Sequence, residues 1–289
     1  MLKSALRDLN RFFPHAGLPK PTSFLNKFGL TPRVEFAMEN LGIREYFTVT
    51  YPANGGSLRV AVRRTEPWLL MENRLFEFDC LEYVSRKVDK GATIIDIGAG
   101  TGVYTLLFSL LVGENGQVKA FEPDPKSRAM LCDNVRRNRA RNVKVDGRCV
   151  SNSSGTAVLR SSGWGTGLST IMTKMCPNPI FEKVVPTTSI DELCREQGLM
   201  PDGIKIDVEG AEKLVLEGAR ATLSDNHVWL LVEFHSGCIA TKEMEDTWRL
   251  LTDRAKSVVL FKGTGILQPS STELVSFTDF NFSHVFIEF

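Results

Sequence analysis

The sequence predicts an α/β protein built on a doubly wound, mostly parallel sheet. From Thr93 onward, apolar β-rich runs alternate with helical segments, and the glycine-rich turn Gly98-Ala-Gly-Thr-Gly joins the first run to a helix. The second run ends in an acid, Glu122. Alternating strands and helices build parallel sheets. A strand, a glycine turn, a helix and a second strand with a terminal acid form the layout of a site for an adenosine-containing cofactor.

The alternation also gives bounds for each element. The helix expected at 103–112 is apolar on nearly every face, so we expect it to lie buried against the sheet. Two β-rich runs close the chain and should pair as an antiparallel edge. A Ser/Gly-rich stretch, 151–173, interrupts the alternation, and its centre around Trp164 predicts a loop over the site. In chain order, strands are expected at 93–97, 117–122, 143–150, 203–207, 228–234, 258–262 and 284–289, and helices at 103–112, 125–137, 211–223 and 242–255.

We expect two units in the chain, an N-terminal extension over residues 1–90 and a main domain over residues 91–289. Residues 1–40 are basic and carry leucines at helical spacing, which predicts an amphipathic arm. Such an arm docks on the main domain or contacts anionic lipid, nucleic acid or a partner. A β-hairpin that turns at Asn54-Gly-Gly and a helix over 72–87 complete the extension.

Composition excludes several classes of protein. The chain has 289 residues, is 43% hydrophobic and carries a net charge of +1, which fits neither a disordered chain nor a strongly polyanion-seeking one. Its 6 cysteines show no paired spacing, which argues against a zinc site, an iron–sulfur cluster and a disulfide framework. The longest apolar run, Leu106–Val112, is too short to span a bilayer, and the charged amino terminus lacks a secretion signal. We therefore expect a cytoplasmic protein without a membrane span.

The glycine spacing separates two candidate cofactors, a nicotinamide dinucleotide and S-adenosylmethionine. The dinucleotide pattern is G-x-G-x-x-G, but here Gly98, Gly100 and Gly102 form G-x-G-x-G, and Val103 stands at the third dinucleotide position. Asp96 precedes the turn, where an acid can hold the ammonium of a methionine moiety and would repel a pyrophosphate. Since an acid at the end of the second strand accepts ribose hydroxyl hydrogens, the pattern favours S-adenosylmethionine.

A second group of ionisable residues follows later strands. Asp207 ends the strand expected at 203–207, Glu209 lies in the turn, and Glu212 begins the next helix. His235 follows the next strand and is a candidate general base. These residues could orient a substrate, remove a proton or share a metal ion. The simpler alternatives are that Glu209 and Glu212 stabilise a helix N-terminus and that His235 is structural.

These motifs resemble the FkbM family of S-adenosylmethionine-dependent methyltransferases. The resemblance covers roughly Gly91 to Phe234, and the run Ile206-Asp-Val-Glu-Gly-Ala-Glu is its most specific part. It implies a Rossmann-like, seven-stranded domain and O-methylation of a hydroxyl on a sugar, polyketide or related metabolite. Asn152 stands where many relatives place an acid or amide toward the adenine, although the loop Val150-Ser-Asn-Ser-Ser-Gly departs from their pattern. The other residues implied to lie at the cofactor are Asp96, Gly98, Ala99, Gly100, Gly102, Tyr104 and Glu122.

Three hypotheses about function follow. The first is an O-methyltransferase for a small molecule with a hydroxyl group, in which Asp207, Glu209, Glu212 and His235 orient and deprotonate the acceptor. The second keeps the fold but makes RNA the acceptor, because the run from Arg136 to Lys144 and the N-terminal arm are basic. The third is a cofactor-fold protein that binds partners without chemistry. The sequence leaves the acceptor and the oligomeric state open.

Overall fold

The computed structural model describes residues 46–53, 56–63, 78–161, 169–224, 227–235, 241–262, 265–267 and 284–289. The expected basic arm, Trp164 and the first residues of the helix expected at 72–87 lie outside the described residues. Within the part of the chain that is described, no helix is both long and apolar enough to cross a membrane.

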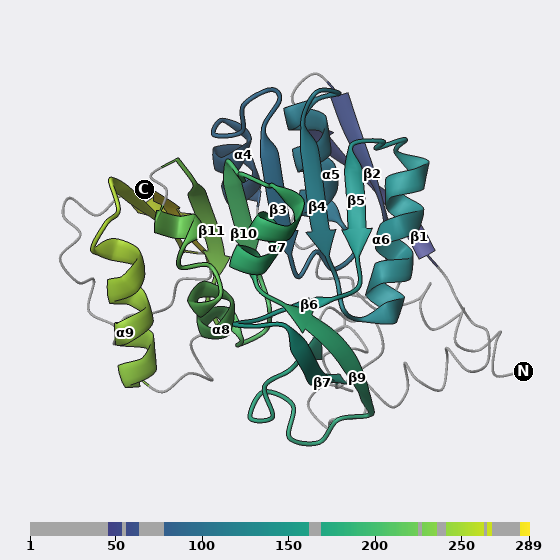
Figure 1. The fold of residues 1–289 in the computed structure, drawn as a ribbon. Helices are drawn as coiled ribbons and strands as arrows, with labels where there is room; N and C mark the ends of the chain where they lie inside the picture. Colours follow the sequence, from purple (N-terminus) through teal and green to yellow (C-terminus); the bar gives the residue numbers. More distant parts are fainter. Residues whose placement is uncertain are drawn as a thin grey trace, which may run out of the picture.

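An eight-stranded sheet forms the centre of the molecule (Figure 1). Five neighbouring strands are parallel, and the strand that ends the chain pairs antiparallel on both sides. The seven predicted strands are all present, and a short eighth strand extends the edge. In spatial order the strands are β13 (Gly265–Leu267), β12 (Ser257–Lys262), β14 (His284–Glu288), β11 (Trp229–Glu233), β10 (Gly203–Ile206), β3 (Thr93–Ile97), β4 (Gln117–Phe121) and β5 (Val143–Asp146).

Helices cover both faces of this sheet, as the predicted doubly wound fold requires. On one face Phe108 of α5 packs with Ile94 and Trp229, and on the other Ile190 of α7 packs with Ile95 and Ile204. Successive strand residues point to opposite faces, which explains why these strands are buried along their whole length. The helices are α4 (Phe78–Ser85), α5 (Val103–Val112) and α6 (Pro125–Arg137) on the first face, and α7 (Ile190–Gln197), α8 (Glu212–Glu217) and α9 (Thr241–Thr252) on the second.

Local capping explains where two of the helices begin. Asp124 accepts hydrogen bonds from the backbone N–H groups of Lys126 and Ser127, and Pro125 takes the first helical position of α6. Ser189 and Glu192 form a capping box at the start of α7 (Ile190–Gln197).

A second sheet of four strands corrects one prediction. The single strand expected at 143–150 is two strands, because the chain leaves the large sheet at Gly147 and continues as β6 (Cys149–Val150) in the small one. The Ser/Gly-rich stretch is also partly regular, since it contains β7 (Gly155–Ser161) and β8 (Ser169–Thr170). With β9 (Phe181–Thr188), these strands lie below the tips of β4 and β5, at the carboxyl ends of the parallel strands (Figure 1).

Two further predictions need adjustment. The helix expected at 211–223 is shorter, because α8 ends at Glu217 and a separate 3₁₀ turn, η3 (Thr222–Ser224), follows it. The two final runs do pair antiparallel, but β14 lies inside the sheet between β11 and β12, and β13 forms the edge.

The expected hairpin is present as β1 (Tyr46–Ala53) and β2 (Gly56–Arg63), a two-stranded antiparallel sheet beside α6. Helix α4 packs on the main sheet, where Tyr83 meets the rings of Phe261 and Phe286 edge-on. The domain boundary at residue 90 stays a prediction.

Candidate functional site

The glycine turn, residues 98–102, is shaped by close approach of the backbone. Gly98 has φ +71°, and a Cβ there would lie 1.7 Å from the carbonyl oxygen of Asp207. Gly102 has φ +97°, and its Cβ would lie 2.5 Å from Leu131 Cδ1. Gly100 also has a positive φ, but no atom of the described residues lies within 4 Å of where its Cβ would be. Two of the glycines therefore let segments pack, and the third leaves space beside the turn.

Glu122 lies directly beneath this turn. Its Oε2 accepts the N–H of Gly100 at 2.7 Å, and its Oε1 accepts the N–H of Asp124 at 2.8 Å. Burial, reinforced by the charge of Asp124, raises the pKa of Glu122 to about 8, although both backbone hydrogen bonds oppose the shift. The acid predicted to meet a ribose is thus fixed to the glycine turn by hydrogen bonds.

Asp96 is fully buried and has partners inside the protein. Its Oδ2 accepts the hydroxyl hydrogen of Thr105, and its Oδ1 lies 3.8 Å from Lys205 Nζ. Burial raises the pKa of Asp96, while the charge of Lys205 and the Thr105 hydrogen bond oppose that shift. Lys205 Nζ also lies 3.1 Å from Asp207 Oδ2 and 3.4 Å from the Gly98 carbonyl oxygen. Lys205 therefore links the glycine turn to the second group of acids.

That second group, which we call the carboxylate–histidine cluster, consists of Asp207, Glu209, Glu212, Glu233 and His235. His235 Nδ1 lies 2.8 Å from Glu212 Oε1, and its Nε2 lies 3.3 Å from Glu209 Oε2. Glu212 is fully buried and also accepts the N–H of Gly210. Glu209 has φ +52°, which is uncommon for a residue with a side chain.

The cluster members shift one another's ionisation. Burial alone would lower the pKa of His235, but the hydrogen bond with Glu212 and the charge of Glu209 raise it to about 9. Burial raises the pKa of Glu209 to about 7, although the charge of His235 opposes this. Burial would also raise the pKa of Asp207, but the stronger combined effect of Lys205, His235 and His284 lowers it. Carboxylates that crowd together in a buried place are stabilised by such cationic neighbours.

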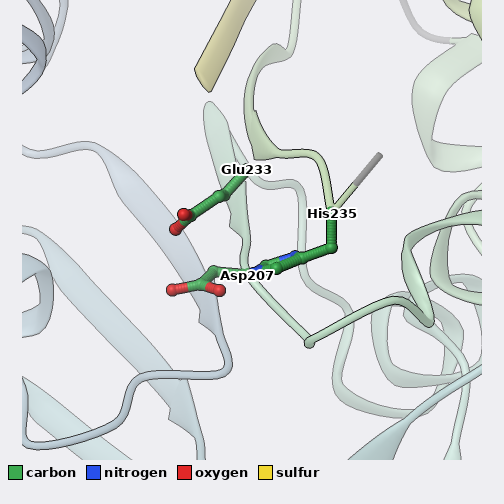
Figure 2. A group of neighbouring side chains, drawn as sticks. All are labelled: Asp207, Glu233 and His235. Carbon is green, nitrogen blue, oxygen red and sulfur yellow. The ribbon is translucent and has the colours of Figure 1, made fainter. Parts of the chain in front are cut away.

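Two adjacent strands bring the cluster together. Asp207 follows β10, Glu233 ends β11, and these strands pair in parallel register. Figure 2 shows the carboxylates of Asp207 and Glu233 pointing the same way, with the His235 ring beside Asp207. Ligand atoms of these three residues lie within 4.8 Å of one another. Glu233 Oε2 also lies 3.4 Å from Nε2 of His284, which is buried.

Strand β8 and the turn after it cover both regions. Ser169 Oγ donates to Asp124 Oδ2 at 3.0 Å, beside Glu122, and Thr170 Oγ1 donates to the Glu209 carbonyl oxygen at 2.7 Å. Met175 packs against Gly210, where a Cβ would lie 2.8 Å from Met175 Cγ. The segment expected over the site thus contacts both halves of it with its described residues.

Three further residues, Ala99, Tyr104 and Asn152, were predicted to lie at the cofactor. Ala99 packs with Ala120 and Leu131 behind the turn. Tyr104 is buried in α5, with its ring 5.0 Å from Lys205 Nζ. Asn152 is exposed after β6, and a Cβ on Gly218 would lie 3.0 Å from its Cα. The structure thus gathers Gly98, Gly100, Glu122 and the cluster, and it places Asn152 beside α8.

Sequence reasoning overlooked three residues of the site. Lys205 was not singled out, although a lysine inside the apolar run Gly203-Ile-Lys-Ile is a signal that a buried charge has a partner. Glu233 was seen at the same sheet edge but was not proposed as a site residue. His284 lies far along the chain from the other members and reaches Glu233 only through the pairing of β14 with β11, which no local motif indicates.

The chain is similar to several known proteins. The family model described as Protein-L-isoaspartate(D-aspartate) O-methyltransferase matches residues 27–155. A probable cobalt-precorrin-6B C(15)-methyltransferase (decarboxylating) of Sulfolobus acidocaldarius is 40% identical over 55 residues, which is 19% of this chain and 29% of that protein.

Among solved structures, the FkbM methyltransferase of Methylobacillus flagellatus is 18% identical, with a TM-score of 0.46 over 68% of this chain and 43% of that one. A putative rRNA methylase of Clostridium thermocellum is 15% identical, with a TM-score of 0.42 over 73% of this chain and 93% of that one. The chain thus spans less than half the length of the curated relative and of the FkbM structure.

The family model described as Methyltransferase FkbM domain matches residues 96–256, from Asp96 before the glycine turn to beyond helix α9. Because this match covers more than half of the chain and includes both regions of the site, the protein belongs to the FkbM family of methyltransferases, whose methyl donor is S-adenosylmethionine.

Proposed function

We propose that this methyltransferase acts on a hydroxyl group of a small molecule, such as a sugar, a polyketide or a related metabolite. One observation carries the proposal: the backbone of Asp207 lies against Gly98, so the carboxylate–histidine cluster adjoins the glycine turn. A methyl donor held at the turn would therefore have potential proton acceptors beside it. The match to an O-methyltransferase model over residues 27–155 supports transfer to oxygen.

The residues around the glycine turn fit S-adenosylmethionine. When bound, S-adenosylmethionine supplies an electrophilic methyl group on a sulfonium. The space beside Gly100 admits a ligand close to the backbone. Each oxygen of Glu122 accepts one backbone hydrogen bond, and a carboxylate oxygen has a second lone pair, so an ionised Glu122 can still accept two ribose hydroxyl hydrogens. Asp96 serves in this proposal as a positioning residue, because its carboxylate contacts Thr105 and Lys205 inside the protein.

The cluster is proposed to orient the acceptor and remove its proton. The acceptor oxygen forms a bond to the methyl carbon, the methyl–sulfur electron pair stays on sulfur, and the hydroxyl proton passes to a carboxylate. Asp207 and Glu209 are the proposed proton acceptors, since both lie in the segment that follows β10, beside Gly98. Both ring nitrogens of His235 already face carboxylates, which favours an orienting role for this ring over direct proton removal. Glu212 is proposed to hold the ring in place through its contact with Nδ1.

RNA as the acceptor is disfavoured by where the charges lie. Helix α6 begins at the site, and its basic end lies 13 residues further on, about 20 Å along the helix axis. There Arg136 and Arg137 both pair with Asp133. The site itself is rich in carboxylates, which repel phosphates.

The test is to incubate the protein with S-adenosylmethionine that carries a labelled methyl group and with fractionated cell extract. We expect label in a small-molecule fraction, in an ether linkage stable to mild base. Asp207→Asn should bind S-adenosylmethionine but lose this transfer. Label that accumulates in RNA, or in methylamines, would refute the proposal.

A further inference from the structure

We propose that Asp207, Glu233 and His235 form a binding site for a divalent transition-metal ion. The inference deepens the proposed function, because an ion there would hold an oxygen of the acceptor beside the glycine turn. It rests on four features of the cluster: the position of the ligand atoms, the orientation of His235, the support of each carboxylate and the balance of charge.

The ligand atoms converge from two neighbouring strands. Ile206 of β10 pairs with Val232 of β11, so Asp207 and Glu233 follow side by side at the same edge of the sheet. Figure 2 shows their carboxylates directed to one side, and the three ligand atoms lie within 4.8 Å of one another. Ligands about 2.0–2.2 Å from one ion stand about 3–4 Å apart. The proposal requires the side chains to move inward by that difference when an ion binds.

His235 is already oriented as a metal ligand. Its Nδ1 lies 2.8 Å from Glu212 Oε1, a carboxylate that accepts the Nδ1 proton, and its Nε2 faces the other acids, so an ion that displaces the second ring proton would bind Nε2. Glu212 is fully buried, and its Oε2 has no hydrogen-bond partner among the described residues. A carboxylate that holds the far nitrogen of a histidine is the common outer contact of a metal-bound imidazole. A structural histidine does not require a buried glutamate with an unused oxygen.

The carboxylates of Asp207 and Glu233 each use one oxygen for a contact within the protein. Lys205 Nζ contacts Asp207 Oδ2, and His284 Nε2 contacts Glu233 Oε2, which leaves the second oxygen of each group for an ion. Glu209 Oε2 lies 3.3 Å from His235 Nε2, so Glu209 adds negative charge beside the three ligand atoms.

Charge also favours a cation here. Four carboxylates, those of Asp207, Glu209, Glu212 and Glu233, meet at this edge, and Lys205 is the permanent cation that contacts the group. One imidazole with two or three carboxylates suits Mn²⁺, Fe²⁺ or Zn²⁺ better than Ca²⁺, which prefers oxygen ligands alone. An ion at this place binds and polarises a hydroxyl oxygen.

The experiment uses the full chain, treated with a chelator and titrated with Mn²⁺ alone, with free Mn²⁺ followed by electron paramagnetic resonance. We expect one Mn²⁺ per chain and a Kd raised at least tenfold by Asp207→Asn and by Glu233→Gln. Glu212→Gln, which removes the partner of His235, should weaken binding by about 10–100-fold. The matched controls Asp89→Asn and Glu196→Gln alter exposed acids and should leave the Kd unchanged.

S-adenosylmethionine binding, measured on the same variants, shows that each is folded and separates the two proposals. Failure of both Mn²⁺ and Zn²⁺ to bind a chain that binds S-adenosylmethionine would overturn the metal site alone. A Kd for Mn²⁺ that the Asp207 and Glu233 substitutions leave unchanged would also overturn the metal site. Saturable metal binding without transfer to any hydroxyl compound would instead refute the proposed function and keep the metal site.

Discussion

The glycine turn and the carboxylate–histidine cluster are neighbours, but they are built on different physical principles. The turn is shaped by backbone: positive φ angles, absent side chains and N–H groups that bind Glu122. The cluster is shaped by charge: buried carboxylates whose repulsion is offset by Lys205 and His235. One region should therefore be sensitive to added volume and the other to removed charge, and four predictions test that difference in order of decreasing effect.

The largest effect is expected for Gly98→Ala. A Cβ at this position would lie 1.7 Å from the carbonyl oxygen of Asp207, in a conformation with φ +71° that favours glycine. We expect a loss of unfolding free energy above about 4 kcal/mol, measured by urea denaturation. Gly100→Ala is the matched control, because its Cβ meets no atom within 4 Å. It should cost only about 1–2 kcal/mol and should mainly weaken S-adenosylmethionine binding. Equal stability of the two variants would contradict this.

The next effect is expected for Lys205→Met, which removes the charge that links the two regions. Lys205 is buried, and its Nζ contacts Asp207 and faces Asp96. Removing one partner of a buried ion pair typically costs about 3–5 kcal/mol, because the remaining charge is uncompensated. Thermal denaturation should show this loss, and Lys183→Met, at an exposed position of β9, should not. A stable Lys205→Met protein would mean that Asp96 and Asp207 do not depend on this cation.

A smaller effect, on binding only, is expected for Glu122→Gln. The amide keeps the volume but loses the charge and one oxygen, which accepts one backbone hydrogen bond and offers one acceptor position for a ribose hydroxyl. S-adenosylmethionine affinity should fall about tenfold, which corresponds to about 1.4 kcal/mol, as measured by titration calorimetry. Glu114→Gln, in an exposed turn, is the control. Unchanged affinity in the Glu122 variant would remove Glu122 from the proposed donor site.

The smallest effect is a pH dependence. The pKa of Glu122 is raised from 4.5 to about 8 in the folded protein. Because a folded chain with a raised carboxyl pKa binds more protons than the unfolded chain, this group stabilises most below pH 4.5 and loses its contribution as pH rises through 8.

Binding has the opposite sign, since the ribose requires the ionised form. Affinity for S-adenosylmethionine should rise as pH approaches 8, by about tenfold in total, because the protonated acid resembles the amide of the Glu122→Gln variant. The groups that face Glu122 are Asp124 and Arg128 on α6, Asp207 after β10 and the neutral thiol of Cys149 on β6. Glu122→Gln should remove both slopes, and a slope that persists in it belongs to another group.

The sequence allowed the central fold to be predicted wherever a local signal marks the end of an element. Helix α5 begins after Gly102, and α6 begins at Pro125 after its cap Asp124. Both starts could be predicted, because a glycine turn and an Asp-Pro pair are local sequence signals. Residues 143–150 were taken as one strand because their alternation continues across Gly147. The choice between two sheets depends on partners elsewhere in the chain, which the segment itself does not encode.

The site was predictable to the same degree. Asp207 and His235 could be placed together because the carboxyl ends of neighbouring parallel strands meet at one edge. Lys205 could have been recognised as a lysine inside an apolar strand, whereas His284 could not, because its partner Glu233 lies on another strand far away in the sequence. The register of β14 against β11, which brings His284 to Glu233, is set by packing across the whole sheet.

The contact between Gly98 and Asp207 has a consequence for redesign of this enzyme. A loop exchanged to change acceptor preference would have to retain the backbone path at Asp207, since the glycine turn packs directly against that carbonyl. Variation should be tolerated better at positions that contact neither this carbonyl nor the carboxylate–histidine cluster. Directed evolution toward new acceptors should therefore leave the segment after β10 unchanged.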